Sequence, residues 1–245
     1  MSWFPIPEEL LFDSEQFRRL PTTAKVFMLA LMSEANLRQG EFYRSDYEWA
    51  VRLKASTSTV YRARRELLRL GWTGVIPGTN NDRGGGLATR YLWVMWSTPP
   101  QEGHWTQMPR YMFETILDRF GPTATLAYVY LTAEKHRYRR RFEDRGKFFI
   151  SLGDMQRASG LRNLYQITRK LHHEFKFNGE KHLFEFSGYR RLVFTEWNVG
   201  DEEVNAEIYL QREEKIRLAA RQLKIEEEGR MEGTRRTVAS VGVHR

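Results

Sequence analysis

Two stretches of the chain carry cationic, hydroxyl and amide side chains at helical spacing. These side chains could bind a ligand through hydrogen bonds and ionic contacts. In residues 57–69 the positions expected to face outward are Ser58, Tyr61, Arg62, Arg65 and Arg69. In residues 161–174 they are Arg162, Asn163, Gln166, Arg169 and Lys170. Arginine and lysine can bind guanine or phosphate, and asparagine or glutamine can pair with adenine. The second stretch therefore has the more base-discriminating set, and the alternative is a basic face that is merely solvated.

The charge of the chain agrees with an anionic partner. The 245 residues have a formal net charge of +8, and residues 1–200 alone carry +9. Residues 201–228 hold 9 acidic and 5 basic residues, so the basic charge belongs to the body that precedes them. A polyanion is the expected partner of such a body, either nucleic acid or an acidic membrane surface.

Composition narrows the class of protein. The chain has no cysteine, which excludes disulfides and thiolate metal sites. Its first residues have neither the basic start nor the long apolar run of a signal peptide. No stretch is as apolar as a membrane span either. We therefore expect a soluble, cytoplasmic protein with no membrane partner.

Catalysis has little support in the sequence. His172 and His173 are adjacent on an expected helix and so face different directions, unlike the paired histidines of nicking enzymes. There is no phosphate-binding loop of the Gly-x-x-x-x-Gly-Lys kind. The carboxylates show no clustering that would hold a metal. We predict no enzymatic activity, no catalytic residue, no cofactor and no metal site.

The sequence segments that are expected to position the two stretches occur in two copies along the chain. Trp3-x-x-x-Pro7 returns as Trp105-x-x-x-Pro109, and the Tyr61 segment returns as the Tyr165 segment. Together with two further matches in the same order, the offsets are 100 to 106 residues. A repeat of this length indicates two domains of one fold. The two tryptophans are expected to pack each pre-helical segment on its core.

Both units have the order helix, strand, helix, helix, hairpin. The expected elements of the first unit are helices at 21–40, 46–53 and 57–69 and strands at 41–44, 72–76 and 91–96. Those of the second unit are helices at 122–138, 152–158 and 161–174 and strands at 147–151, 182–186 and 191–197. This order is typical of a winged helix, in which the second helix of a helix-turn-helix enters the major groove and a β-hairpin forms the wing.

The sequence therefore predicts an α+β protein with tandem winged-helix domains and a helical, partly disordered C-terminal tail. The expected boundaries are domain 1 at 1–98, a stiff linker at 99–104, domain 2 at 105–200 and the tail at 201–245, with disorder from Gly229 onward. The expected wing contacts to phosphate or to the minor groove are Arg83, Arg90, Arg190 and Arg191. A glycine-rich hairpin tip that is only a permissive turn is the alternative.

In architecture, residues 3 to about 200 resemble the theta-type plasmid replication initiators, the Rep proteins with two winged helices. The resemblance implies that Arg162, Asn163, Gln166, Arg169 and Lys170 are the principal base readers, and that the first unit contributes backbone contacts and dimerisation. It also implies a homodimer and recruitment of host replication helicase machinery. Two features depart from the family: Pro99-Pro100 breaks its usual interdomain helix, and Arg64 stands where many winged helices have leucine.

From these observations we expect a sequence-specific binder of double-stranded DNA that initiates plasmid or phage replication at origin repeats. Two other functions remain open at this point. One is a transcriptional or partition regulator that only occupies an operator. The other is a winged-helix adaptor that binds proteins.

Overall fold

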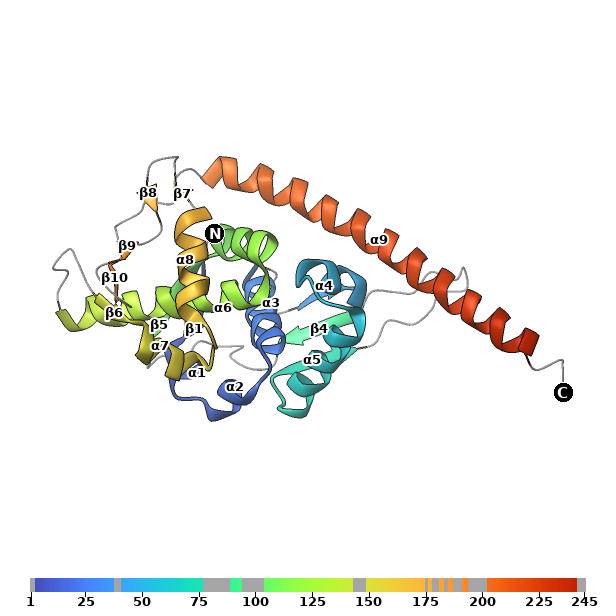
Figure 1. The fold of residues 1–245 in the computed structure, drawn as a ribbon, viewed down its shortest axis with the longest axis horizontal. Helices are drawn as coiled ribbons and strands as arrows, with labels where there is room; N and C mark the ends of the chain where they lie inside the picture. Colours follow the sequence, from blue (N-terminus) through green and yellow to red (C-terminus); the bar gives the residue numbers. More distant parts are fainter. Residues whose placement is uncertain are drawn as a thin grey trace.

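The structure is a computed structural model of a mostly helical α+β protein with small antiparallel sheets (Figure 1). The residues that it describes are 3–37, 41–76, 89–93, 104–142, 149–174, 176–177, 181–182, 185–186, 191–193 and 202–241. Side chains are described for residues 3–35, 44–74, 104–110, 113–137, 151–172 and 211–231. Within these ranges no helix has the length and apolar character required to cross a bilayer.

The first half contains the elements expected from the sequence and three more. Its helices are α1 (Glu8–Phe12), α2 (Glu15–Arg19), α3 (Thr22–Leu37), α4 (Asp46–Arg52) and α5 (Thr57–Arg69). Its strands are β1 (Trp3–Pro7), β2 (Glu41–Arg44), β3 (Thr73–Ile76) and β4 (Thr89–Trp93). The last three strands form an antiparallel sheet in the order β2-β4-β3. Helices α1 and α2 and strand β1 were not expected from the sequence.

The second half repeats this arrangement. Its helices are α6 (Arg110–Phe142), α7 (Leu152–Ser159) and α8 (Leu164–Glu174). Its strands are β5 (Trp105–Pro109), β6 (Phe149–Ser151), β7 (Lys176–Phe177), β8 (Lys181–His182), β9 (Glu185–Phe186) and β10 (Arg191–Val193). An antiparallel sheet with the order β6-β10-β9 corresponds to the sheet of the first half, and β7 pairs with β8.

One helix start agrees with the prediction and one differs. The residues of α6 form two helical segments separated at Gly121, whose φ of 78° and ψ of −176° are not helical, so the second segment begins after Gly121, as expected for the helix from Pro122. Helix α8 begins at Leu164 instead of 161. The reason is that Asn163 has a φ of 60°, which is not helical, and its carbonyl accepts the first hydrogen bonds, from the amides of Gln166 and Ile167.

The two halves meet through the strands β1 and β5. Strands β1 and β5 pair antiparallel with the register Trp3↔Pro109, Pro5↔Gln107 and Pro7↔Trp105, so each repeat of the tryptophan motif lies against the other. Beside this sheet the rings of Phe4 and Phe113 meet edge to face at 5.4 Å. The duplicated sequence thus folds into a duplicated structure whose copies face each other.

One hydrophobic core serves both halves. Helix α3 is buried nearly all round, from Val26 to Leu31, because it packs against α5 of its own half and α6 of the other. An apolar surface of this kind is typical of a helix inside a core. The relative orientation of the halves is therefore fixed by shared packing, where the sequence had suggested a stiff linker. Of the expected linker 99–104 only His104 is described, so the predicted domain boundaries stay a prediction.

The prediction for Trp3 is wrong, since its side chain is 40% exposed. Side chains alternate between the two faces of a strand, and in β1 it is Phe4 and Ile6 that point into the core. Met108 is the buried counterpart on β5, and Trp105 is half-buried.

The C-terminal tail is a single helix, α9 (Glu202–Val241). The prediction of disorder from Gly229 onward is wrong, because the helix continues through Val241. Figure 1 shows α9 passing over α4 and extending beyond the body. Ile216 and Ala220 are buried against the body, and Leu223 packs against the core.

Candidate nucleic-acid interface

Helix α5 presents a polar face because its apolar face is buried. Val60, Ala63 and Leu67 are the buried residues of the helix, and they pack against the core. Ser56 caps the helix, since its hydroxyl accepts a hydrogen bond from the Thr59 amide at 3.3 Å. Burial of that stripe directs the opposite residues to solvent, and the exposed ones include Ser58, Tyr61, Arg62, Arg65 and Arg69.

The cations of α5 are not equivalent. The Arg62 Nε donates to the Ser58 carbonyl of the preceding turn at 3.3 Å. Arg69 pairs with Glu66 at 3.0 Å, which offsets part of its charge. The Arg65 guanidinium lies 5.9 Å from the centroid of the Tyr61 ring.

Arg64 has a structural role. Its guanidinium forms an ion pair with Asp46, in the first turn of α4, and both side chains are largely covered. It also lies 5.3 Å from the centroid of the Tyr61 ring. The departure from leucine at this position is thus explained by a polar contact that fastens α5 to α4.

Helix α8 is built in the same way. Leu164, Thr168 and Leu171 are buried, and the Thr168 hydroxyl donates to the Leu164 carbonyl at 3.0 Å. Three of the predicted base-reading residues are exposed on the opposite face: Gln166, Arg169 and Lys170. The Lys170 ammonium lies 5.8 Å from the Phe120 ring centroid, which places this cation over the end of the first segment of α6.

Two predicted helix residues lie in the turn before α8. Arg162 and Asn163 are exposed, but the helix starts only after them, because Asn163 adopts the left-handed conformation. This corrects their predicted place on the helix face. The turn is anchored to the first half by Lys25, whose Nζ donates to the Ser159 carbonyl at 3.1 Å. Burial of Lys25, and then the nearby charge of Arg18, lower its pKa.

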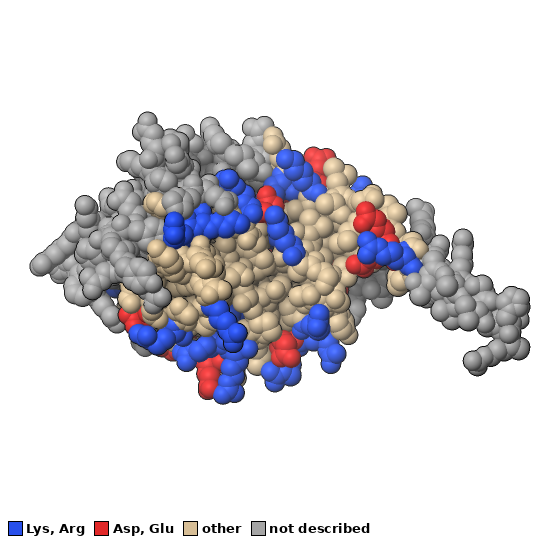
Figure 2. Space-filling model, in the orientation of Figure 1, with Lys and Arg blue, Asp and Glu red and all other residues tan. Residues whose placement is uncertain are grey.

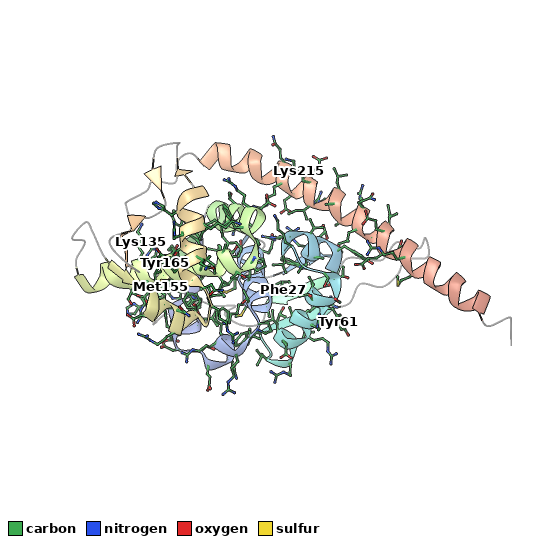
Figure 3. All side chains as sticks on the ribbon, viewed as in Figure 1. Phe27, Tyr61, Lys135, Met155, Tyr165 and Lys215 are labelled. Atoms are coloured by element: carbon green, nitrogen blue, oxygen red, sulfur yellow. The ribbon has the colours of Figure 1, made fainter. Side chains whose placement is uncertain are left out.

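Helices α5 and α8 share one tyrosine–arginine arrangement, in which Tyr61 is exposed and Tyr165 is partly buried against the core. Tyr61 and Arg65 are four residues apart, as are Tyr165 and Arg169, and in both pairs the guanidinium lies 5.9 Å from the ring centroid. Figure 3 shows the tyrosines well separated in that view, one on each helix. A guanidinium over a ring is attracted to its face and loses part of its rotational freedom. Sequence reasoning named all four residues but not this pairing.

The structure describes only two of the four predicted wing arginines, and only their backbone. Arg83 and Arg190 lie outside the described residues. Arg90 stands in β4 opposite Tyr43 and Ile76, and Arg191 stands in β10 opposite Ser151, with only their backbone described. Their contact with nucleic acid stays a prediction.

Two further cations extend the basic surface of α5, and sequence reasoning missed them. Arg18 and Arg19 are exposed on α2, which is held near α5 because Phe17 packs on Trp72 with centroids 6.5 Å apart. Figure 2 shows lysine and arginine side chains along the lower edge of the molecule, where Figure 1 places α2 and α5, with acidic side chains among them. The signal in the sequence was Ser14 followed by Glu15, a helix start that places both arginines in the last turn.

A buried ion network holds the two halves and the helices of the site in place. Arg52 pairs with Glu34 at 2.5 Å and with Glu114 of the other half. Arg44 pairs with Glu34 at 2.8 Å. Burial alone would raise the pKa of Glu34, but the guanidinium groups of Arg52 and Arg44 lower it to about 2.

Among the described residues there is no group of three or more side chains suited to hold a metal ion. A scan against known protein families, a search of curated proteins and a search of solved structures each found no match.

Proposed function

We propose that each half is a winged helix, and that the protein binds double-stranded DNA with α5 and α8 as its reading helices. The element order supports this, because in each half two helices are followed by strands, one of which pairs with the strand that precedes the helices: β4 with β2, and β10 with β6. The observation that carries the proposal is the Tyr–Arg pair repeated on both helices, with the exposed guanidinium groups of Arg65 and Arg169 beside Tyr61 and Tyr165. Pre-positioned guanidinium groups on a helix suit contacts with phosphate or guanine in the major groove.

We further propose that the two helices divide the work. On α5 the polar groups around Arg65 are a serine hydroxyl and arginines that already contact Ser58 or Glu66, which suits the gripping of phosphates. On α8, Gln166 adds an exposed amide that can pair with adenine. A shared core would keep both helices in one relative orientation, so that the protein reads two half-sites at a fixed spacing.

The biological role that fits best is the initiation of plasmid or phage replication at repeated origin sequences. A body with two rigidly related reading helices would cover a repeat of about 20 base pairs, since each half-site occupies about one helical turn. Binding of such repeats beside an AT-rich stretch would then lead to strand opening and helicase recruitment. The test is a footprint on the DNA that flanks the gene, followed by permanganate detection of opened thymines. A footprint without opening would favour a regulator that only occupies its site.

Arg169→Ala is expected to weaken binding to the preferred duplex by about 1–3 kcal/mol and to relax base preference. The reason is the loss of a guanidinium held on the reading face of α8. Arg157→Ala is the matched control, because Arg157 is an exposed arginine of α7 that pairs with Asp154. Equal losses in the two variants on every sequence would show that Arg169 contributes charge alone. Fluorescence anisotropy with a selected duplex and scrambled duplexes measures both effects.

Duplex binding is expected to fall steeply with salt. If six or more phosphates are contacted, the affinity should drop about 10³-fold or more between about 50 and 200 mM salt, because bound counterions are released. A titration of the wild-type protein with duplex at several salt concentrations gives the slope. Absence of duplex binding at low salt would overturn the proposed function and leave the protein-adaptor alternative.

A further inference from the structure

Within residues 211–231, where side chains are described, α9 has a docking face whose members are three or four residues apart: Glu213, Ile216, Ala220, Leu223 and Glu227. Arg212 lies beside this face. Residues 212–220 make most of these contacts. Glu213 pairs with Arg44 at 2.7 Å, Arg212 donates to the Glu114 carbonyl, and Ile216 and Ala220 are buried.

The same face ends on the start of α5. The Thr57 hydroxyl, in the first residue of that helix, donates to both carboxylate oxygens of Glu227, at 2.9 and 3.2 Å. On the neighbouring α4, burial and then the negative charges of Glu227, Glu228 and Asp46 raise the pKa of Tyr47. The start of α5 thus has the carboxylate of Glu227 in direct contact.

This is the place where DNA would contact α5. In a helix-turn-helix the N-terminal residues of the reading helix approach the bases, and helix N-termini also bind phosphate oxygens. Ser58, a predicted DNA contact, directly follows Thr57. The positive end of the helix dipole and the Thr57 hydroxyl can bind a carboxylate or a phosphate, but not both at once.

We propose that α9 is an intramolecular competitor of DNA, in which the Glu227 carboxylate occupies the place of a backbone phosphate at the start of α5. The inference rests on the proposed function. Duplex binding would require the last docked turns of α9 to lift from α5, while the turns around Glu213 and Ile216 stay docked.

The contacts of α9 allow such partial lifting. Beyond Leu223, which is only partly buried, the helix carries the exposed apolar residues Ile225 and Met231, 62% and 55% accessible. The hydrogen bonds from the Thr57 hydroxyl hold Glu227 at the start of α5. Segments with few buried apolar contacts open at low cost. Lifting from residue 224 onward would leave the anchoring ion pair and both buried side chains in place.

Glu227→Ala in the full chain is the test, with Glu226→Ala as the matched control. Both variants remove one carboxylate from adjacent positions of the same helix, but Glu226 contacts Gln222 on α9 itself and pairs with Arg230. We expect Glu227→Ala to bind a mixed-sequence duplex of about 40 base pairs about 3- to 10-fold more tightly than the wild type, because a larger fraction of the protein is binding-competent. The control should change by less than about twofold.

The outcomes separate this inference from the proposed function. If all forms bind duplex but Glu227→Ala does not raise the affinity, or raises it no more than Glu226→Ala does, the proposed competition by α9 is overturned. The proposed DNA binding then still stands. If no form binds duplex at low salt, the proposed function fails and the competitor with it. Because duplex binding and docking of α9 would oppose each other, bound duplex should in turn loosen the helix. Duplex should therefore raise the rate of amide hydrogen exchange in residues 224–231 of the wild type. Unchanged exchange at saturating duplex would also overturn the inference.

Discussion

Arg52→Met is expected to lower the free energy of unfolding by about 3–5 kcal/mol, the cost of leaving buried charge uncompensated. The Arg52 side chain is fully buried between Glu34 of the first half and Glu114 of the second. Without the guanidinium, Glu114 loses its partner on α4, and Glu34 loses its ion pair with Arg52 while it keeps the one with Arg44. Because methionine fills a similar volume, the loss of stability comes from the missing charge more than from a cavity. Urea unfolding followed by circular dichroism measures it.

Arg69→Met is the control for Arg52→Met. Arg69 also pairs with a glutamate, Glu66, but both side chains are exposed, and pairs of that kind contribute about 0–1 kcal/mol. Similar losses in the two variants would mean that the network does not bind the halves together. We expect the Arg52 variant alone to weaken the contact between α4 and α6.

Acid is expected to remove about 3 kcal/mol of stability through Glu34 alone. Its pKa is about 2 in the folded protein against an ordinary 4.5, and each unit corresponds to about 1.4 kcal/mol. A depressed carboxyl pKa stabilises the fold above the unfolded pKa, so this contribution is complete near neutral pH. It is lost as pH falls from about 5 to about 2.

The comparison of wild type with Glu34→Gln isolates this carboxyl from all others. The stability difference between the two proteins should shrink by about 3 kcal/mol between about pH 6 and about pH 2, because glutamine does not titrate. Glu15→Gln serves as the control, since Glu15 forms an exposed pair with Arg19. If the stability difference between wild type and Glu34→Gln changes with pH as little as it does for Glu15→Gln, the role given to the network would be contradicted.

The sequence by itself determined the local elements and the outward faces. Helix α5 was predicted with the bounds that it has, because an apolar stripe at Val60, Ala63 and Leu67 follows a serine cap, and both signals lie within a few turns. The same reasoning identified the exposed residues of α8. The duplication was visible for the same reason, since repeated segments can be compared along the chain without knowledge of their contacts.

The tertiary structure decided what depends on residues that are distant in sequence. Arg52 and Glu114 are 62 residues apart, and Thr57 and Glu227 are 170 apart. Periodicity within a helix carries no information about such pairs, because it states which face is buried but not what covers it. The antiparallel pairing of β1 with β5, the ion network and the carboxylate of α9 at the start of α5 are consequences of packing two copies face to face and laying one more helix across them.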